Sequence, residues 1–470
     1  MERKWWTLIA VVAGIFMLLL DVTIVNVALP QIQTAFDASL SDLQWVIDAY
    51  ALSLAVLLLT AGTLADKFGR RKLYATGTAV FTAGSLLCGF ADSALQLSVF
   101  RALQGVGGSI MFATSLALLS ATFHGKDRGV AFGALGATTG VALALGPVIG
   151  GALTSGVSWR WIFLVNVPVG LLTIFVTNAM VNESKDPEAS SMDWPGLITL
   201  SSGLGALVYG LIEAGGGWTQ TKVEVLLASG VALLLVFVMV EAMQKRPMLD
   251  LQLFKVPTFV GGLVAAAAIS GSLIATFPFL VLYLQNGLHY SAFQTGLRLM
   301  VLTGAVFVAA GISGRLIDKV PVRALIGGGF VFVTIGLLLM RGITVTSSWT
   351  HLIPGLVLAG IGNGMINVPL ASTAVGVVRP QRAGMASGVN ATFRQVGTAA
   401  GVAALGAVFS SHVTSAQGPA GAVDGLNEIL LISACVTAVA AACALLLIRK
   451  RDFVDAQAEE DELPKLDAVA

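Results

Sequence analysis

The sequence predicts an all-α membrane protein in which two six-helix bundles flank two additional helices, fourteen transmembrane helices in all. Three observations support this fold class. Hydrophobic residues make up 56% of the 470 residues and charged residues only 11%, whereas a soluble protein of this length needs more charge on its surface. Apolar runs long enough to cross a bilayer, about 20 residues each, follow one another along the chain. A short segment of the first bundle also recurs in the second.

Charged and helix-breaking residues delimit the apolar runs and so define where the helices are expected. The connections between the runs are too short for a separate soluble domain. The first six helices are expected near 6–30, 42–64, 73–92, 95–118, 129–153 and 160–181, the additional pair near 194–213 and 222–243, and the last six near 258–284, 292–314, 324–343, 352–375, 384–410 and 427–448.

These runs divide the chain into four parts. They are a first bundle (1–181), the inserted pair of helices (182–250), a second bundle (251–451) and an acidic tail (452–470) that we expect to be disordered. Most basic residues fall in alternate connections, including Lys67 to Lys72 and the cluster at Arg449 to Arg451. The positive-inside rule then places both termini in the cytoplasm and requires an even number of helices. The compact connections favour a bacterial inner membrane.

An internal repeat relates the two bundles. The segment from Gly62 through Asp66 to Lys67 recurs from Gly314 through Asp318 to Lys319, in each case at the end of the second helix of a six-helix group. Duplicated halves suit alternating access, in which one half rocks against the other around a central site.

Five segments resemble sequence motifs of a known family, in the expected order and in the expected helices. They read LDVTIVNVALP (20–30), GTLADKFGRRK (62–72), RALQGVGG (101–108), GVALALGPVIGG (140–151) and WRWIFLVNVP (159–168). Together they resemble the fourteen-helix drug:proton antiporters of the major facilitator superfamily, and the resemblance covers most of the chain.

The resemblance implies a major facilitator fold and a monomeric proton-coupled antiporter that exports small amphipathic or cationic organic compounds. It implies no cofactor, because the proton gradient supplies the energy. It assigns a gating role to the loop motif and its repeat, at Gly62, Asp66, Gly69, Arg70, Arg71 and Asp318. The segment of the fifth helix associated with antiport contains Gly140, Gly146, Pro147, Gly150 and Gly151.

Charged residues inside the expected spans are the sharpest candidates for function, since each costs about 2.5–3.5 kcal/mol at a helix centre. Asp21, Asp48 and Arg101 should share one layer in the outer half of the first bundle. Burial disfavours an ionised carboxylate, whereas a nearby arginine favours it. We therefore expect the two carboxyl groups to exchange protons under the influence of Arg101, with Asp21 the stronger candidate. The alternative is a permanent structural ion pair between Arg101 and one of them.

A substrate cavity should be apolar with a few polar groups. The expected lining residues are Phe16, Phe112, Phe277, Tyr283, Gln285, Asn367, Asn390 and Arg394. Asn390 and Arg394 lie one turn apart, so they form a polar stripe on one helix face.

Other functions have less support in the sequence. A dedicated exporter of one natural product, lipid or metabolite is the main alternative, followed by uptake through proton symport and by a sensor or scaffold without transport. The sequence contains no GxxxxGK[ST] phosphate loop and no recognisable catalytic or metal-ligand spacing, so an enzyme is not expected. The basic residues follow the membrane pattern and do not indicate nucleic-acid binding.

Overall fold

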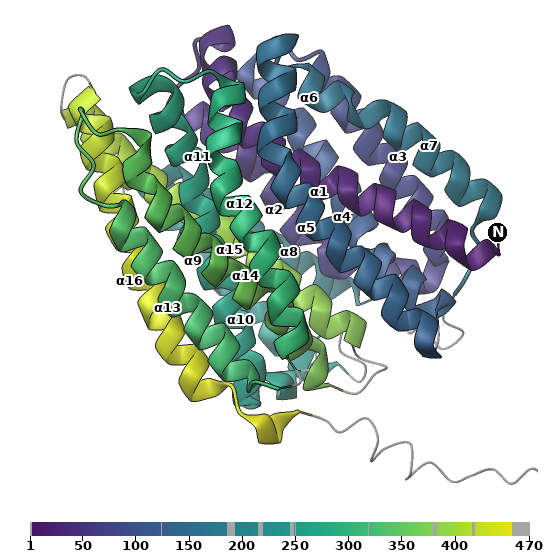
Figure 1. Cartoon of the computed structure of the whole chain (residues 1–470). Coiled ribbons are helices and arrows are strands. Elements are labelled where there is room, and N and C mark those ends of the chain that lie inside the picture. Colours follow the sequence, from purple (N-terminus) through teal and green to yellow (C-terminus); the bar gives the residue numbers. More distant parts are fainter. Residues whose placement is uncertain are drawn as a thin grey trace, which may run out of the picture.

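The computed structural model describes residues 2–123, 125–185, 193–214, 220–244, 249, 251–317, 319–378, 383–415 and 419–453. These residues form a bundle of long helices, with no strand among them. Figure 1 shows the chain running from the purple helices of the first half to the green and yellow helices of the second. Each of the fourteen expected spans is mainly helical, although two of them, 160–181 and 258–284, are made of more than one helical segment. The predicted acidic tail lies outside the described residues beyond Phe453.

The first half contains seven helices: α1 (Arg3–Phe36), α2 (Leu40–Phe68), α3 (Arg70–Gly89), α4 (Ala94–Thr122), α5 (Gly125–Gly156), α6 (Trp161–Leu164) and α7 (Asn166–Met180). A capping box begins α2, because the Ser39 hydroxyl accepts from the Asp42 amide and the Asp42 carboxylate accepts from the Ser39 amide. Gly69, at φ +110°, separates α2 from α3 in a conformation that favours glycine. The expected sixth helix is two helices, α6 and α7, joined at Val165.

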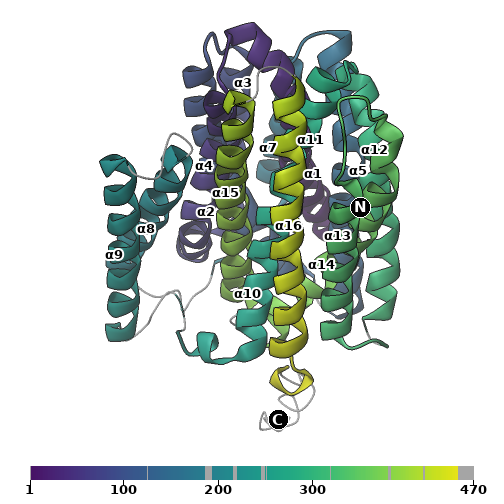
Figure 2. The ribbon, with the colours of Figure 1, turned by 90° about the vertical axis from the view of Figure 1, so that its left-hand side faces the viewer.

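The inserted pair forms a hairpin of α8 (Trp194–Glu213) and α9 (Thr221–Met243) at one edge of the molecule (Figure 2). Helix α8 packs against α2 and also against α15 (Ala383–Ser415) of the second half. The rings of Trp45 and Tyr209 meet edge to face at 5.2 Å. Helix α9 packs mainly on α8 and exposes apolar side chains such as Leu235 and Met239, as expected for a surface in contact with lipid.

The second half begins with a helical rod in which two π-helical turns alternate with α-helix. The rod consists of η2 (Leu251–Lys255), α10 (Pro257–Ile269), η3 (Ser270–Ile274), α11 (Ala275–Leu282) and η4 (Tyr283–Gly287). The remaining elements are α12 (Ala292–Leu316), α13 (Val322–Met340), η5 (Trp349–Leu352), α14 (Ile353–Gly376), α15, α16 (Pro419–Leu447) and η7 (Lys450–Asp452).

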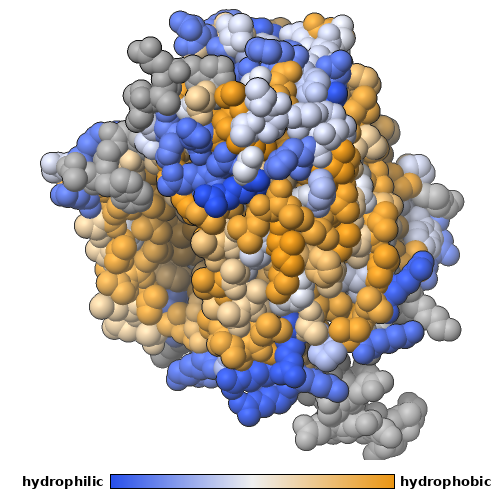
Figure 3. Space-filling view, turned by 60° about the vertical axis from the view of Figure 1, so that its left-hand side comes forward, coloured by the Kyte–Doolittle hydropathy of each residue, from blue (hydrophilic) through white to orange (hydrophobic). Residues whose placement is uncertain are grey.

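On the face shown in Figure 3, a broad apolar band lies between two hydrophilic ends. Among the described residues, twelve helices are long and apolar enough to span a bilayer, and a thirteenth is counted if the bent helix α5 is one span. The expected number of fourteen is therefore not confirmed. Helix α3 is not among the twelve, because it begins with Arg70, Arg71 and Lys72 and is rich in glycine, threonine and alanine.

The two halves contact each other mainly at the end of the bundle opposite to the start of α1 and the end of α16, here called the far end. Helix α2 packs against α15, and α5 packs against α12. Close approach of α5 and α12 requires small residues: a Cβ on Gly151 would lie 2.5 Å from the Ala292 carbonyl oxygen, and a Cβ on Gly296 would meet the Pro147 carbonyl.

Side-chain hydrogen bonds join the halves at the same end. Gln285 donates to the Val27 carbonyl at 2.8 Å, and the Phe293 amide donates to Ser155 Oγ at 3.0 Å. Toward the other end the helices separate, and no described atom lies within 4 Å of a Cβ built at Gly136 of α5 or Gly311 of α12. Figure 1 shows the two groups of helices diverging away from the far end.

Candidate functional site

Asp21 of α1 lies at the centre of a fully buried hydrogen-bond network. Its Oδ2 accepts from Arg101 Nη1 at 2.5 Å, while its Oδ1 accepts from Gln104 Nε2 at 2.8 Å and from Asn166 Nδ2 at 3.1 Å. These partners come from α4 and α7. The carboxylate therefore has a charged partner on one oxygen and two amide donors on the other, as a buried ion pair requires.

The network continues through Ser85 of α3, whose hydroxyl accepts from Gln104 at 3.2 Å and from Asn166 at 3.0 Å and donates to the Phe163 carbonyl at 2.9 Å. Two residues of α2 orient the Arg101 side chain. Its Nε donates to the Val46 carbonyl at 3.2 Å, and its guanidinium lies 4.2 Å from the centre of the Tyr50 ring. The network thus ties most helices of the first half together and is neutral overall.

Asp48 of α2 has a different environment from Asp21. Its side chain is 0% exposed, and neither carboxyl oxygen has a hydrogen-bond partner among the described residues. One turn before it, Gln44 donates to the Val402 carbonyl of α15. One turn after it, Ala51 belongs to an apolar cluster with Ala399 and Ala403 of α15. Asp48 shares their helix face, so it points into the seam between α2 and α15, where Val208 of α8 also packs.

The expected grouping of the three charged residues is therefore only partly observed. Arg101 pairs with Asp21 and approaches α2 at Val46 and Tyr50, on the side of the helix away from the seam. Within the described part of the chain it makes no ion pair with Asp48. The sequence identified Asp21, Asp48 and Arg101 but missed Gln104, Asn166 and Ser85, although the first two stand within the quoted motifs.

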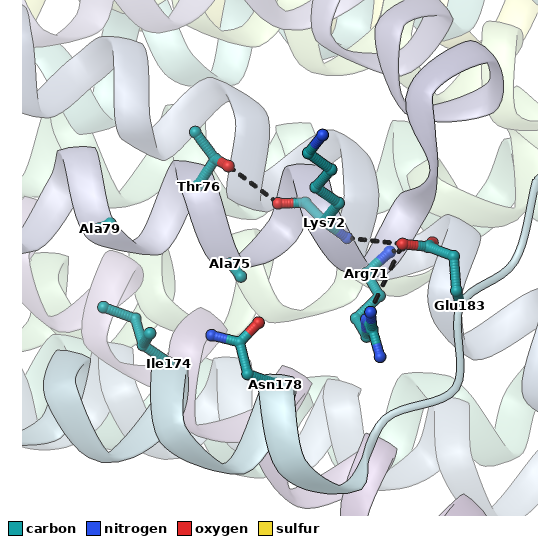
Figure 4. Close-up of a pocket in the computed structure, with 8 residues that line it drawn as sticks. All are labelled: Arg71, Lys72, Ala75, Thr76, Ala79, Ile174, Asn178 and Glu183. Carbon is teal, nitrogen blue, oxygen red and sulfur yellow. Dashed lines mark hydrogen bonds and ion pairs between the residues drawn. The ribbon is translucent and has the colours of Figure 1, made fainter.

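The loop motif between α2 and α3 is held by a residue that the sequence did not single out. The Glu183 carboxylate accepts from the backbone amides of Arg71 at 3.0 Å and Lys72 at 3.2 Å, and it lies 3.8 Å from the Arg71 guanidinium (Figure 4). A carboxylate at this position caps the first turn of α3. The side chain of Asp66 and the whole of Asp318 lie outside the described residues, so the expected gating pair has no structural account.

The same region contains a hollow of about 370 Å³ between α3 and α7. In Figure 4 Arg71 and Glu183 lie at one side of the hollow, and Ala79 and Ile174 lie at the other. The lining residues are Arg71, Lys72, Ala75, Thr76, Ala79, Ile174, Asn178 and Glu183.

Helix α5 lies between α1 and α12, and its glycines mark both contacts. A Cβ on Gly146 or Gly150 would strike α1 at Thr23 or Ile24, and one on Gly140 would lie 2.8 Å from the Phe307 ring of α12. The helix bends by 41° between Gly133–Ala142 and Leu145–Gly156, next to Pro147, which cannot donate a backbone hydrogen bond. The expected glycine motif therefore lies where the two halves meet.

The expected cavity residues fall into three groups. Arg394 of α15 donates through Nη2 to Asn367 Oδ1 of α14 at 2.6 Å, and Asn390 is buried nearby on α15. Gln285 and Tyr283 belong to η4, where Gln285 joins the halves and the Tyr283 side chain is buried. The third group consists of partly buried aromatic residues packed on hydrophobic clusters: Phe16, Phe112 and Phe277.

Two further charged positions are accounted for by local contacts. The Arg298 guanidinium stacks on the rings of Tyr290, at 3.6 Å, and Trp349, at 5.1 Å. Glu213 pairs with Lys222 at 3.0 Å across the α8–α9 turn. Both pairs lie near helix ends, where long side chains reach the membrane interface.

Long apolar helices with an apolar outer surface, and charged groups enclosed between them, define a multi-pass membrane protein. The sequence profile of the Major Facilitator Superfamily matches residues 11–402. The chain belongs to this superfamily.

Its relatives include exporters that confer resistance. The chain is 37% identical over 418 residues to the multidrug resistance protein Stp of Mycobacterium tuberculosis, covering 88% of this chain and 77% of that protein. It is 36% identical over 436 residues to the puromycin resistance protein pur8 of Streptomyces alboniger, covering 90% and 86%. The tetracenomycin C resistance and export protein of Streptomyces glaucescens is 34% identical over 419 residues, with 87% and 77% covered.

Solved structures share the fold at much lower identity. The human organic anion transporter MFSD10 (TETRAN) superposes with a TM-score of 0.65 at 14% identity, over 94% of this chain and 100% of that one. A bacterial homologue of the human lysosomal transporter Spinster gives a TM-score of 0.65 at 17% identity, over 96% and 98%. The family profile and the relatives named for drug resistance confirm the predicted membership of the superfamily and the relationship to drug exporters.

Proposed function

We propose that this protein is a proton-coupled antiporter that exports small amphipathic organic compounds, including cationic ones, across a bacterial inner membrane by alternating access. The observation that carries the proposal is Asp48, a fully buried carboxyl group without a hydrogen-bond partner among the described residues. The relatives named for multidrug and antibiotic resistance support export as the direction. The protein acts as a monomer and uses the proton gradient in place of a cofactor.

The proposed topology has fourteen spans with both termini in the cytoplasm. The number includes α3 and the bent α5 in addition to the twelve apolar helices. The alternation of basic connections supports this orientation. The far end of the bundle is then the outer end, and the contacts between the halves close the outer side while the inner side is open.

Asp48 is the better of the two proton carriers. Asp21 is held by Arg101, Gln104 and Asn166, so protonating it would break a satisfied ion pair. An ionised Asp48 in the closed seam would cost several kcal/mol, whereas a protonated Asp48 carries no charge. Protonation from outside therefore favours closure of the seam between α2 and α15, and release of the proton to the cytoplasm favours its reopening.

The test is transport in proteoliposomes with an imposed pH gradient. Doxorubicin, a fluorescent amphipathic amine, serves as the transported compound. We expect the gradient to drive accumulation in the wild type and Asp48→Asn to abolish the response to the gradient. The matched control is Asp37→Asn, which changes an exposed carboxylate just before the same helix and should leave accumulation within about twofold.

Other results of the transport assay would favour a different proton site, symport, or export of a single natural product. Gradient-driven accumulation that survives in Asp48→Asn would contradict the proton role of Asp48. Movement of doxorubicin with the proton flux, rather than against it, would indicate symport. If folded protein moves one natural product but no other compound, the protein is a dedicated exporter, a function suggested by its relative the tetracenomycin C resistance and export protein.

A further inference from the structure

We infer that the exported compound presents a negatively charged or strongly accepting oxygen, such as a carboxylate, phenolate or quinone oxygen, to Arg394. This inference rests on the proposed function, because it specifies the substrate of that exporter. It arises from two hydrogen-bond donors on one face of α15, Arg394 and Asn390, whose charge or N–H group is not compensated among the described residues.

Arg394 is a cation within the membrane region of the fold. It lies about 16 Å along α15 from Ala383, at roughly 1.5 Å per residue. Ala391, one turn earlier, packs against the hydrophobic cluster of the first half, so this face of α15 is directed toward the interface between the halves. A charge at such a depth is costly unless a partner compensates it.

The partner of Arg394 is neutral. Its Nη2 donates to Asn367 Oδ1 at 2.6 Å, and within the described part of the chain no carboxylate lies within ion-pair distance of the guanidinium. Asn367 is oriented by Asn363, since its Nδ2 donates to the Asn363 carbonyl at 3.0 Å and to Asn363 Oδ1 at 2.9 Å. The asparagine pair thus fixes the guanidinium but does not neutralise it, and the other guanidinium N–H groups are available to a ligand.

Asn390 adds a second donor on the same face. It is 7% exposed, and its Nδ2 has no hydrogen-bond partner among the described residues. Residues four apart on a helix are neighbours, so Asn390 and Arg394 present their donors together. A buried donor without an acceptor is destabilising, and a substrate oxygen would remove that cost.

The neighbouring charged groups do not supply the missing acceptor. Asp21 is paired with Arg101 inside the first half, and the Glu213 carboxylate of α8 is paired with Lys222. Asp48 faces α15 beside Ala399, more than one turn from Arg394, and forms no ion pair with it. His412, near the far end of α15, is 2.9 Å from Glu428. The first half therefore contains a compensated arginine and the second an uncompensated one.

The experiment measures ligand binding to the purified full chain in detergent by titration calorimetry. The probes are anthraquinone-2-carboxylate and the neutral anthraquinone-2-carboxamide, which have the same ring system. We expect the wild type to bind the carboxylate about tenfold more tightly, in line with a charge-assisted hydrogen bond. Arg394→Gln should abolish this preference, and Arg394→Lys should retain part of it because the charge remains.

Two further variants keep the inference falsifiable. Arg298→Gln removes another arginine of the second half that is stacked on aromatic rings, and it should keep the full preference. Asn390→Leu should weaken binding of both probes several-fold. Equal binding of the two probes by the wild type, or an undiminished preference in folded Arg394→Gln, overturns the inference.

The titration and the transport assay together separate this inference from the proposed function. If doxorubicin is accumulated under a pH gradient but the probes bind equally, export stands and the role of Arg394 is wrong. If the carboxylate preference depends on Arg394 but no gradient-driven movement of any compound occurs, the binding site stands and proton-coupled export is wrong.

Discussion

At the scale of single residues, the two halves treat buried charge differently. In the first half, Asp21 and Arg101 neutralise each other and are surrounded by amide and hydroxyl groups. Asp48, in the seam, has no such partners among the described residues. Because breaking a buried pair leaves an uncompensated charge, the first arrangement is suited to stability and the second to a change of protonation.

This difference predicts that Asp21 matters for folding. Asp21→Asn leaves Arg101 buried without a counter-charge and should cost about 3–5 kcal/mol of stability, seen as a lower melting temperature of the purified protein in detergent. The double variant Asp21→Asn/Arg101→Gln should recover part of the loss because it removes both charges.

The control is Asp37→Asn, which changes an exposed carboxylate after the same helix and should melt within about 1 °C of the wild type, as surface substitutions usually do. A melting temperature unchanged by Asp21→Asn would show that the ion pair contributes nothing to the fold.

The sequence predicts some of these buried polar residues as functional candidates but not others. Asp21, Asp48 and Arg101 were predictable because charges are rare in apolar runs. Gln104, Asn166 and Ser85 were not, since uncharged polar residues are common in membrane helices and only the packing of α3, α4 and α7 on α1 brings these three to one carboxylate. The different environments of Asp21 and Asp48 depend on which helix each side chain faces, which is a property of the assembled bundle.

At the scale of helices, composition locates the elements but not their irregularities. Every expected span falls on helical residues, because a bilayer selects apolar runs of nearly constant length. The junction at Val165 and the π-helical turns at Ser270–Ile274 and Tyr283–Gly287 were not predicted. Hydropathy measures composition, whereas these features are changes of hydrogen-bond register. Such π-helical turns often occur at functional sites, and the second one carries Gln285, which bonds to the first half.

The contact between α5 and α12 yields a prediction about conformation. Gly151→Leu places a side chain against the Ala292 carbonyl and Phe293, so it should hold the far end apart and favour the state that is open to the outside. Cysteines at Ser155 and Phe293, in a background without Cys88, Cys435 and Cys443, should form a disulfide readily in the parent and several-fold more slowly in the Gly151→Leu variant.

The matched control for this prediction is Gly156→Leu, five residues further along α5, where a Cβ meets no described atom within 4 Å. Cross-linking should proceed there as in the parent. Equal rates in all three proteins would mean that Gly151 does not govern closure.

At the scale of the whole molecule, the inserted hairpin is attached to both halves. Helix α8 packs on α2 and α15, while α9 is largely exposed. The seam that α8 covers is the one that contains Asp48, so the hairpin shields the proposed proton site from lipid. The repeat in the sequence predicted two related halves, but it did not predict where the inserted pair of helices packs.

The proposed topology makes a prediction about sidedness. In the cysteine-free background, Thr346→Cys, in the exposed connection after α13, should react with a membrane-impermeant maleimide added to intact cells. Lys450→Cys, after α16, should react only once the membrane is broken. Labelling of both positions in intact cells would place the C-terminus outside and contradict an even number of spans.

The hydrogen bonds between the two halves at the far end contribute to the free energy needed to open that end. They are made by Gln44, Gln285, Asn286 and the Phe293 amide, and none is an ion pair. A neutral hydrogen bond contributes about 1 kcal/mol net, so these bonds together resist opening by only a few kcal/mol. A single proton falling through 100 mV releases about 2.3 kcal/mol. The hydrogen bonds across the far end are therefore comparable in energy with the movement of one proton in the proposed cycle, and most of the remaining resistance to opening comes from the packing of α2 on α15 and of α5 on α12.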